Sequence, residues 1–161
     1  MRIIGLCGAS EASREMVALR LRTKYGVPTI NVERASEMVT AKNTKGLDMV
    51  IEEIGEVFLK DDGSLDKKMI AEELVKKGKG EALRVIISNA INQMMADSMK
   101  KLENAGHKVV VVNYGYSPHM GYEEQIILGG EFVELKELEG SYFLESTKEE
   151  DVDILLKEIL K

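Results

Sequence analysis

The clearest chemical signal in this 161-residue chain is a run of eight residues near its start: Gly8, Ala9, Ser10, Glu11, Ala12, Ser13, Arg14 and Glu15. The apolar run at residues 3–7 predicts a strand, and residues 13–25 predict a helix. A strand, a small-residue turn and a helix form the frame of a phosphate-binding loop, because the turn amides and the positive end of the helix attract an anion. We therefore predict that residues 8–15 bind the phosphates of a nucleotide.

Three positions of this loop depart from the pattern G-x-x-x-x-G-K-[ST], which would begin at Gly8. Ser13 replaces the second glycine, Arg14 the lysine and Glu15 the hydroxyl residue. Arg14 keeps a positive charge but presents a planar fork in place of a point charge. Glu15 places a carboxylate where a hydroxyl normally meets Mg²⁺, which requires a metal between it and the phosphates. We predict Arg14 as a catalytic cation and Glu15 as a metal ligand, with an ordinary strand-to-helix turn as the alternative.

Composition and charge limit the setting. The chain is 44% hydrophobic and 31% charged, as expected of a globular protein with a real core, and we predict a single domain over residues 1–161. The formal net charge of −6 argues against nucleic-acid binding. The sequence has no apolar run as long as a membrane span and no signal-peptide pattern, so we predict a cytoplasmic protein without a membrane partner.

Two sets of side chains near the predicted strands are expected to be structural. Cys7, the one cysteine, ends the first strand and is predicted to be a buried thiol. Tyr114, Tyr116 and Tyr122 have the chemistry to stack on a nucleotide base, although their spacing favours packing in the core or at its rim.

The remaining elements alternate in type, which favours an α/β fold with a mainly parallel sheet. We predict further strands at 27–32, 108–112 and 131–135. We predict helices at 47–59, 80–105, 122–128 and 149–160, and one more helix that begins after a cap at Ser64. In such a sheet, ligands bind at the carboxyl ends of the strands. Those ends are the loop after Gly8, residues 31–34 and residues 113–117.

Two parts of the sequence resemble known kinase families. Residues 26–35 (GVPTINVERA), with Ile54-Gly55 and residues 59–66 (LKDDGSLD), resemble the dephospho-coenzyme A kinase pattern, in which a strand ending in I-D-A-D is followed by D-G-S-L-D-R. Residues 109–116 (VVVVNYGY) and 128–133 (LGGEFV) are more similar to the bacteriophage-type deoxynucleoside monophosphate kinases. Both families share the P-loop kinase fold, so the resemblance implies a three-layer, P-loop NTPase-like α/β domain.

The resemblance also implies roles for five residues outside the loop. Glu33 matches the second acid of I-D-A-D, which makes it the candidate catalytic base or metal ligand. Asn31 matches the first acid, and Asn113 stands where the monophosphate kinases have the acid of a D-x-R motif, so both are candidate substrate contacts. Arg34 and Arg84 are candidate contacts to the phosphates of the acceptor, with surface salt bridges as the alternative.

Three functions are compatible with these residues. The first is a kinase that uses Mg²⁺ and ATP, or another nucleoside triphosphate, to phosphorylate a (deoxy)nucleoside monophosphate or a dephospho-coenzyme A-like acceptor. The second is a non-catalytic kinase-fold protein that acts by binding a nucleotide or a protein partner. The third is a nucleotide hydrolase or nucleoside transferase in which Glu15 and Glu33 share a metal. Under any of these functions the apolar helix at 80–105 is a candidate surface for a homodimer, with a monomer as the alternative.

Overall fold

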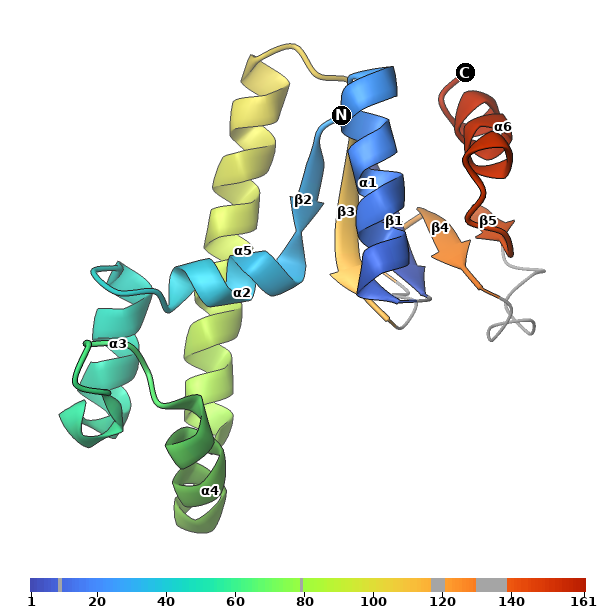
Figure 1. Cartoon of the computed structure of the whole chain (residues 1–161). Helices are drawn as coiled ribbons and strands as arrows, with labels where there is room; N and C mark the ends of the chain where they lie inside the picture. Colours follow the sequence, from blue (N-terminus) through green and yellow to red (C-terminus); the bar gives the residue numbers. More distant parts are fainter. Residues whose placement is uncertain (9, 79, 117–120, 130–138) are drawn as a thin grey trace. The chain divides into compact units, whose positions relative to one another are not determined.

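The computed structural model describes residues 1–8, 10–78, 80–116, 121–129 and 139–161 (Figure 1). These residues form two compact units. Unit 1 comprises Met1–Val32 and Lys101–Lys161, and unit 2 comprises Glu33–Lys100. The single domain expected from the sequence stays a prediction. No helix among the described residues combines the length and the apolar character needed to cross a membrane.

Unit 1 is built on a five-stranded sheet in the order β2-β3-β1-β4-β5. Its strands are β1 (Arg2–Gly8), β2 (Thr29–Asn31), β3 (Val109–Gly115), β4 (Glu124–Leu128) and β5 (Ser141–Leu144). All four pairings between these strands are parallel. Central parallel strands are covered on both faces, which explains why the β-branched run in β3 is continuous and not alternating. The predicted α/β fold with a mainly parallel sheet is confirmed.

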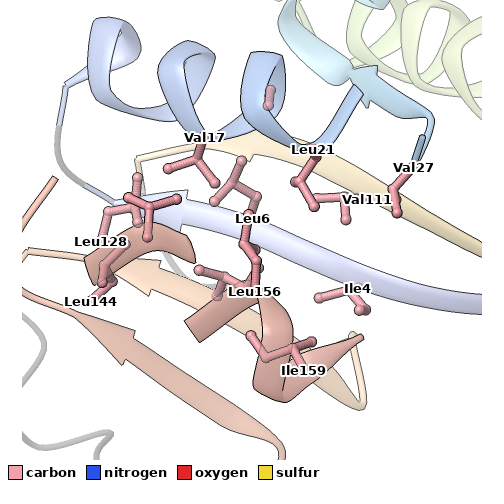
Figure 2. Close-up of a cluster of buried hydrophobic side chains, with 13 residues drawn as sticks. Ile4, Leu6, Val17, Leu21, Val27, Val111, Leu128, Leu144, Leu156 and Ile159 are labelled. Carbon is pink, nitrogen blue, oxygen red and sulfur yellow. The ribbon is translucent and has the colours of Figure 1, made fainter. Parts of the chain in front are cut away.

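Two helices pack on one face of this sheet, α1 (Glu11–Tyr25) and α6 (Glu149–Ile159). Figure 2 shows the core between them and the strands, where Leu6 of β1 meets Val17 and Leu21 of α1 and Leu156 of α6. All four side chains are at most 1% exposed. Burial of such apolar side chains is the main term that holds the helices on the sheet. Gly26, which ends α1 at φ +64°, takes the left-handed conformation that favours glycine.

The prediction for residues 122–128 is wrong, because this segment contains strand β4 and not a helix. Its apolar residues Ile126, Ile127 and Leu128 are consecutive and all at most 1% exposed. A short apolar run is compatible with either element, and only the neighbouring strands β1 and β5 decide for a strand buried on both faces. Strand β5 was not expected, and the strand predicted at 131–135 lies outside the described residues.

Unit 2 is helical. It contains most of α2 (Val32–Val39), then α3 (Lys45–Ile54), the short 3-10 helix η1 (Glu56–Phe58), α4 (Lys67–Lys77) and α5 (Gly80–Asn104) as far as Lys100. Its own core joins side chains of α3, η1 and α5 with Leu65: Leu47, Val50, Ile54, Phe58, Leu65 and Leu83. Helix α2 was not expected from the sequence.

Two boundaries in unit 2 differ from the predicted ones. The helix predicted at 47–59 ends at Ile54, because Gly55 turns the chain at φ +96°. The cap predicted at Ser64 is wrong. The Ser64 backbone N–H and hydroxyl both donate to Asp62, whereas Asp66 accepts the N–H of Met69 at 3.0 Å and caps the first turn of α4.

Helices α1 and α6 are also joined by a polar cluster around Asp153. Arg20 donates to both carboxylate oxygens, at 2.8 and 2.5 Å, and Lys24 donates to the same group. The Tyr25 hydroxyl adds a hydrogen bond at 3.0 Å. The hydrogen bonds from Arg20, and then that from Lys24, hold the pKa of Asp153 well below its usual range. The folded protein therefore favours the charged form of this largely buried carboxylate.

This cluster makes part of the stability depend on pH. A carboxyl whose pKa is lowered by folding stabilises the protein above its unfolded pKa, about 3.9, and loses that effect as the pH falls through the lower folded value. We expect Asp153→Asn to lower the melting temperature by several degrees at pH 7, and the gap from the wild type to narrow below about pH 4. Thermal melts across pH test this. Glu150→Gln, an exposed change on the same helix, is the control, and a gap that stays constant with pH would contradict the role given to Asp153.

Gly8 at the end of β1 has a structural reason to be glycine. Its φ is +87°, and a Cβ at this position would lie 2.2 Å from the Leu128 carbonyl oxygen of β4, its partner in the sheet. Gly26 has a similar φ of +64° but open space around the position of a Cβ. A substitution at Gly8 therefore brings both backbone strain and a steric clash, whereas the same substitution at Gly26 brings backbone strain alone.

We expect Gly8→Ala to reduce the free energy of unfolding by about 3 kcal/mol, because left-handed strain and overpacking add. Gly26→Ala carries only the strain, and we expect a loss of about 1 kcal/mol. Urea denaturation of both variants measures the difference. Equal losses would show that the close approach of β1 and β4 does not require glycine.

Candidate phosphate-binding site

The segment after β1 has the predicted strand, turn and helix. Helix α1 begins at Glu11, two residues earlier than expected, and Ser10 caps it by accepting the Ser13 backbone N–H at 3.2 Å. The hydroxyls of Ser10 and Ser13 lie 3.0 Å apart. Ala9 lies outside the described residues. The helix end thus faces the carboxyl edge of the sheet with an exposed, hydroxyl-lined first turn.

Arg14 is the most buried charged side chain of this region, with 4% of its surface exposed. Its Nε–H donates to Asn113 Oδ1 and one of its terminal nitrogens donates to the Gly8 carbonyl oxygen, each at 3.1 Å. The guanidinium therefore ties the first turn of α1 to the ends of β1 and β3. Buried cations need such acceptors, because an unpaired charge in the interior is strongly unfavourable.

Glu15 makes the corresponding contacts to β2. Its Oε1 accepts from the Asn31 side-chain amide at 3.1 Å, and its Oε2 lies 3.8 Å from the Arg22 guanidinium. Asn31 and Asn113 are paired in the register of β2 and β3. Arg14, Glu15, Asn31 and Asn113 thus form one group, which we call the polar quartet. Arg14 bonds the side-chain amide of Asn113, and Glu15 bonds that of Asn31.

The polar quartet brings together four predicted site residues, with Gly8 beside them. It does not provide a metal centre in its present contacts, because Glu15 already bonds an amide and faces an arginine. No group of three His, Cys, Asp or Glu side chains among the residues that the structure describes has the arrangement to hold a metal ion. In these contacts Glu15 acts as a partner of Asn31 and Arg22, and the metal-ligand role predicted for it stays a prediction.

The predicted site residues of α2 and α5 belong to unit 2, whereas Glu11 and Ala12 of the loop lie exposed in the first turn of α1 in unit 1. Glu33 and Arg34 lie in the first turn of α2 and are exposed. Arg84 is 77% exposed on α5 and pairs with Glu81 at 3.0 Å, which is the surface salt bridge considered as its alternative role. The roles expected for these three residues stay predictions.

Two tyrosines of unit 1, Tyr114 and Tyr122, pack against each other. The rings of Tyr114 and Tyr122 stack with centroids 4.9 Å apart, and the Tyr114 hydroxyl donates to the buried Gln125 side chain. They lie against Gly5, where a Cβ would come within 2.6 Å of Tyr114. Packing, the favoured expectation, is confirmed for this pair. The glycine inside the first strand was the available signal, since such glycines mark close approach of other groups.

Cys7 is fully buried, and burial raises the pKa of its thiol, an effect that Tyr114 and Arg14 partly oppose. The thiol form is therefore favoured at neutral pH. The prediction of a buried thiol is confirmed.

A family model described as dephospho-CoA kinase matches residues 2–115. The chain is 28% identical to the dephospho-CoA kinase of Shouchella clausii over 111 residues, covering 68% of this chain and 56% of that protein. The dephospho-CoA kinase of Bdellovibrio bacteriovorus is also 28% identical, over 117 residues, with coverages of 69% and 55%. The chain therefore spans about half the length of these curated relatives.

Solved structures show the same fold. Dephospho-CoA kinase from Campylobacter jejuni superposes with a TM-score of 0.71 at 13% identity, covering 99% of this chain and 96% of that one. TT1252 from Thermus thermophilus superposes with a TM-score of 0.70 at 16% identity and the same coverages. The P-loop NTPase-like fold is thus confirmed. The deoxynucleoside monophosphate kinases receive no specific support from these matches. With its family match running from β1 through β3, the chain belongs to the dephospho-CoA kinase family.

Proposed function

We propose that this protein is a nucleotide-dependent kinase that transfers a phosphoryl group from ATP to dephospho-CoA or a closely similar acceptor. The observation that carries the proposal is the family match over residues 2–115, which includes the loop and the three strand ends beside it. Since the chain covers about half of its curated relatives, its activity needs a direct test. A small-molecule nucleotide is the proposed partner, while a homodimer and a cytoplasmic location stay predictions.

Residues 8–15 and the amino end of α1 would hold the phosphates of ATP in this proposal. Arg14 would supply the positive charge near the transferred group, positioned by Asn113. Mg²⁺, which usually neutralises phosphate oxygens in such reactions, does not fit the present contacts of Glu15. The proposal therefore gives this neutralising role in unit 1 to Arg14.

Glu33 is the proposed general base. Its carboxylate would take the proton of the acceptor hydroxyl as that oxygen bonds to the γ-phosphorus and the bond to ADP breaks. Arg34 and Arg84 are the proposed contacts to the acceptor phosphates. Both are exposed arginines of unit 2, with the planar fork that suits phosphate.

A second function, nucleotide binding without transfer, is favoured by one specific observation. The Arg14 guanidinium donates to a backbone carbonyl and to Asn113, and these contacts hold it inside the protein. Phosphoryl transfer depends on positive charge directed at the transition state. An Arg14 guanidinium held by these contacts would still attract a bound phosphate but would add little to the rate of transfer.

Release of ADP in the presence of ATP distinguishes the two functions. We expect turnover with dephospho-CoA and none across a panel of deoxynucleoside monophosphates. We expect Arg14→Ala to reduce kcat/KM by about 100-fold or more, since one charged contact to a transition state is worth several kcal/mol, and Arg14→Lys to keep part of the rate. Lys157→Ala, which removes an exposed cation of α6, is the control. ATP binding with no reactive acceptor would replace the kinase proposal by the second function.

The role of Glu33 is tested separately. Loss of a general base typically lowers the rate by about 100-fold, so we expect Glu33→Gln to reduce kcat by about that factor. Glu37→Gln is a matched control, because Glu37 is also exposed and lies one turn further along α2. Steady-state rates of both variants with saturating ATP make the comparison. Equal rates in the two variants would remove Glu33 from the mechanism.

A further inference from the structure

The two residues that face each other at the carboxyl ends of β2 and β3 are neutral amides. Asn31 and Asn113 are in register across the sheet, and each bonds a charged residue of the same helical turn of α1. Asn31 donates to the Glu15 carboxylate, while Asn113 accepts from the Arg14 guanidinium. A side-chain amide has both a donor and an acceptor. Asparagine can therefore donate to a carboxylate at position 31 and accept from a guanidinium at position 113.

This arrangement is unfavourable for a divalent cation. Mg²⁺ requires oxygen ligands with their lone pairs directed at it, in nearly octahedral geometry. Oε1 of Glu15 and Oδ1 of Asn113 already accept N–H groups, at 3.1 Å each. A cation placed between them would also approach the Arg14 guanidinium, whose 4% exposure leaves the repulsion poorly screened.

The same arrangement favours a phosphate. Arginine presents five N–H donors in a planar fork that matches two oxygens of a phosphate group. A phosphate oxygen entering the loop is able to replace the Gly8 carbonyl as an acceptor, while the bond from Nε to Asn113 keeps the guanidinium in place. The Arg22 guanidinium, 3.8 Å from Oε2 of Glu15, reduces the repulsion between that carboxylate and an anion.

We infer that this loop binds the polyphosphate of a nucleotide without a divalent cation, with Arg14 as the fixed positive charge in its place. The inference rests on the proposed function, because it concerns the same nucleotide site. It concerns binding to unit 1, so it is measured independently of phosphoryl transfer.

Calorimetric titration of the full chain with ATP tests this inference directly. One titration contains EDTA in excess and the other Mg²⁺ in excess, at matched ionic strength. We expect the two dissociation constants to agree within about threefold, or the EDTA value to be lower. Binding that is more than about threefold tighter with Mg²⁺, or that occurs only with it, would overturn the inference.

A charge-changing variant sharpens the test. Asn31→Asp places a second carboxylate against Glu15, so we expect ATP binding in EDTA to weaken by about tenfold or more and Mg²⁺ to restore it. Asn104→Asp adds the same charge at the exposed end of α5, ahead of the first residue of β3 in the chain, and should change neither titration. The wild-type titrations decide the question even where Asn31→Asp does not fold, which thermal melts establish.

The outcomes separate this inference from the proposed function. Binding that requires Mg²⁺ overturns the inference and leaves the kinase proposal intact. Absence of ATP binding in both titrations overturns the proposed function, and the inference with it. Equal binding in the two titrations supports the inference whether or not an acceptor is later phosphorylated.

Discussion

The burial of the Arg14 guanidinium is the constraint on which the candidate site depends. A cation with 4% exposure must have hydrogen-bond acceptors within the protein, and the Gly8 carbonyl at the end of β1 and the Asn113 side chain near the end of β3 are two of them. The first turn of α1 is thereby fixed against the sheet edge. The residue that the sequence suggests for phosphate binding is thus also the residue that holds the loop in shape, so its removal affects folding and binding together.

Helix α1 is held at both of its ends by polar contacts and along its length by an apolar core. Near its carboxyl end, Arg20, Lys24 and Tyr25 all bond Asp153 of α6. Between the two ends, Val17 and Leu21 lie in the core shown in Figure 2. Apolar packing is non-directional and leaves a helix some freedom to slide, whereas charged hydrogen bonds at each end specify its position. The position of the loop over the strand ends therefore depends on contacts to Asp153 and Leu156 of α6, which are far from the loop in the sequence.

Much of the fold could be predicted from local pattern, and much of the site could not. Strands β1 and β3 and helices α1 and α6 have long or strongly periodic signals, and all four were expected. Strand β4 was misassigned because a run of three apolar residues does not distinguish strand from helix until its neighbours are known. Sequence reasoning placed Asn31 and Asn113 at the correct sheet edge, since parallel strands end together. It did not predict their bonds to Glu15 and Arg14, because those depend on the rotation of α1, which the core and Asp153 determine.

The residues of the loop that depart from the pattern G-x-x-x-x-G-K-[ST] are better understood together with their partners than one position at a time. An arginine in place of a lysine needs acceptors for a planar fork, and the Gly8 carbonyl and Asn113 provide them. A glutamate in place of a hydroxyl residue needs donors, and Asn31 and the nearby Arg22 provide them. An aspartate at position 31 would repel Glu15, and a hydrophobic residue at 113 would leave Arg14 with a missing acceptor. Each of the four residues of the polar quartet is thus suited to the identity of its partner. Such matched pairs are expected where the residues have changed together, and they are not expected where each position of the loop has changed independently.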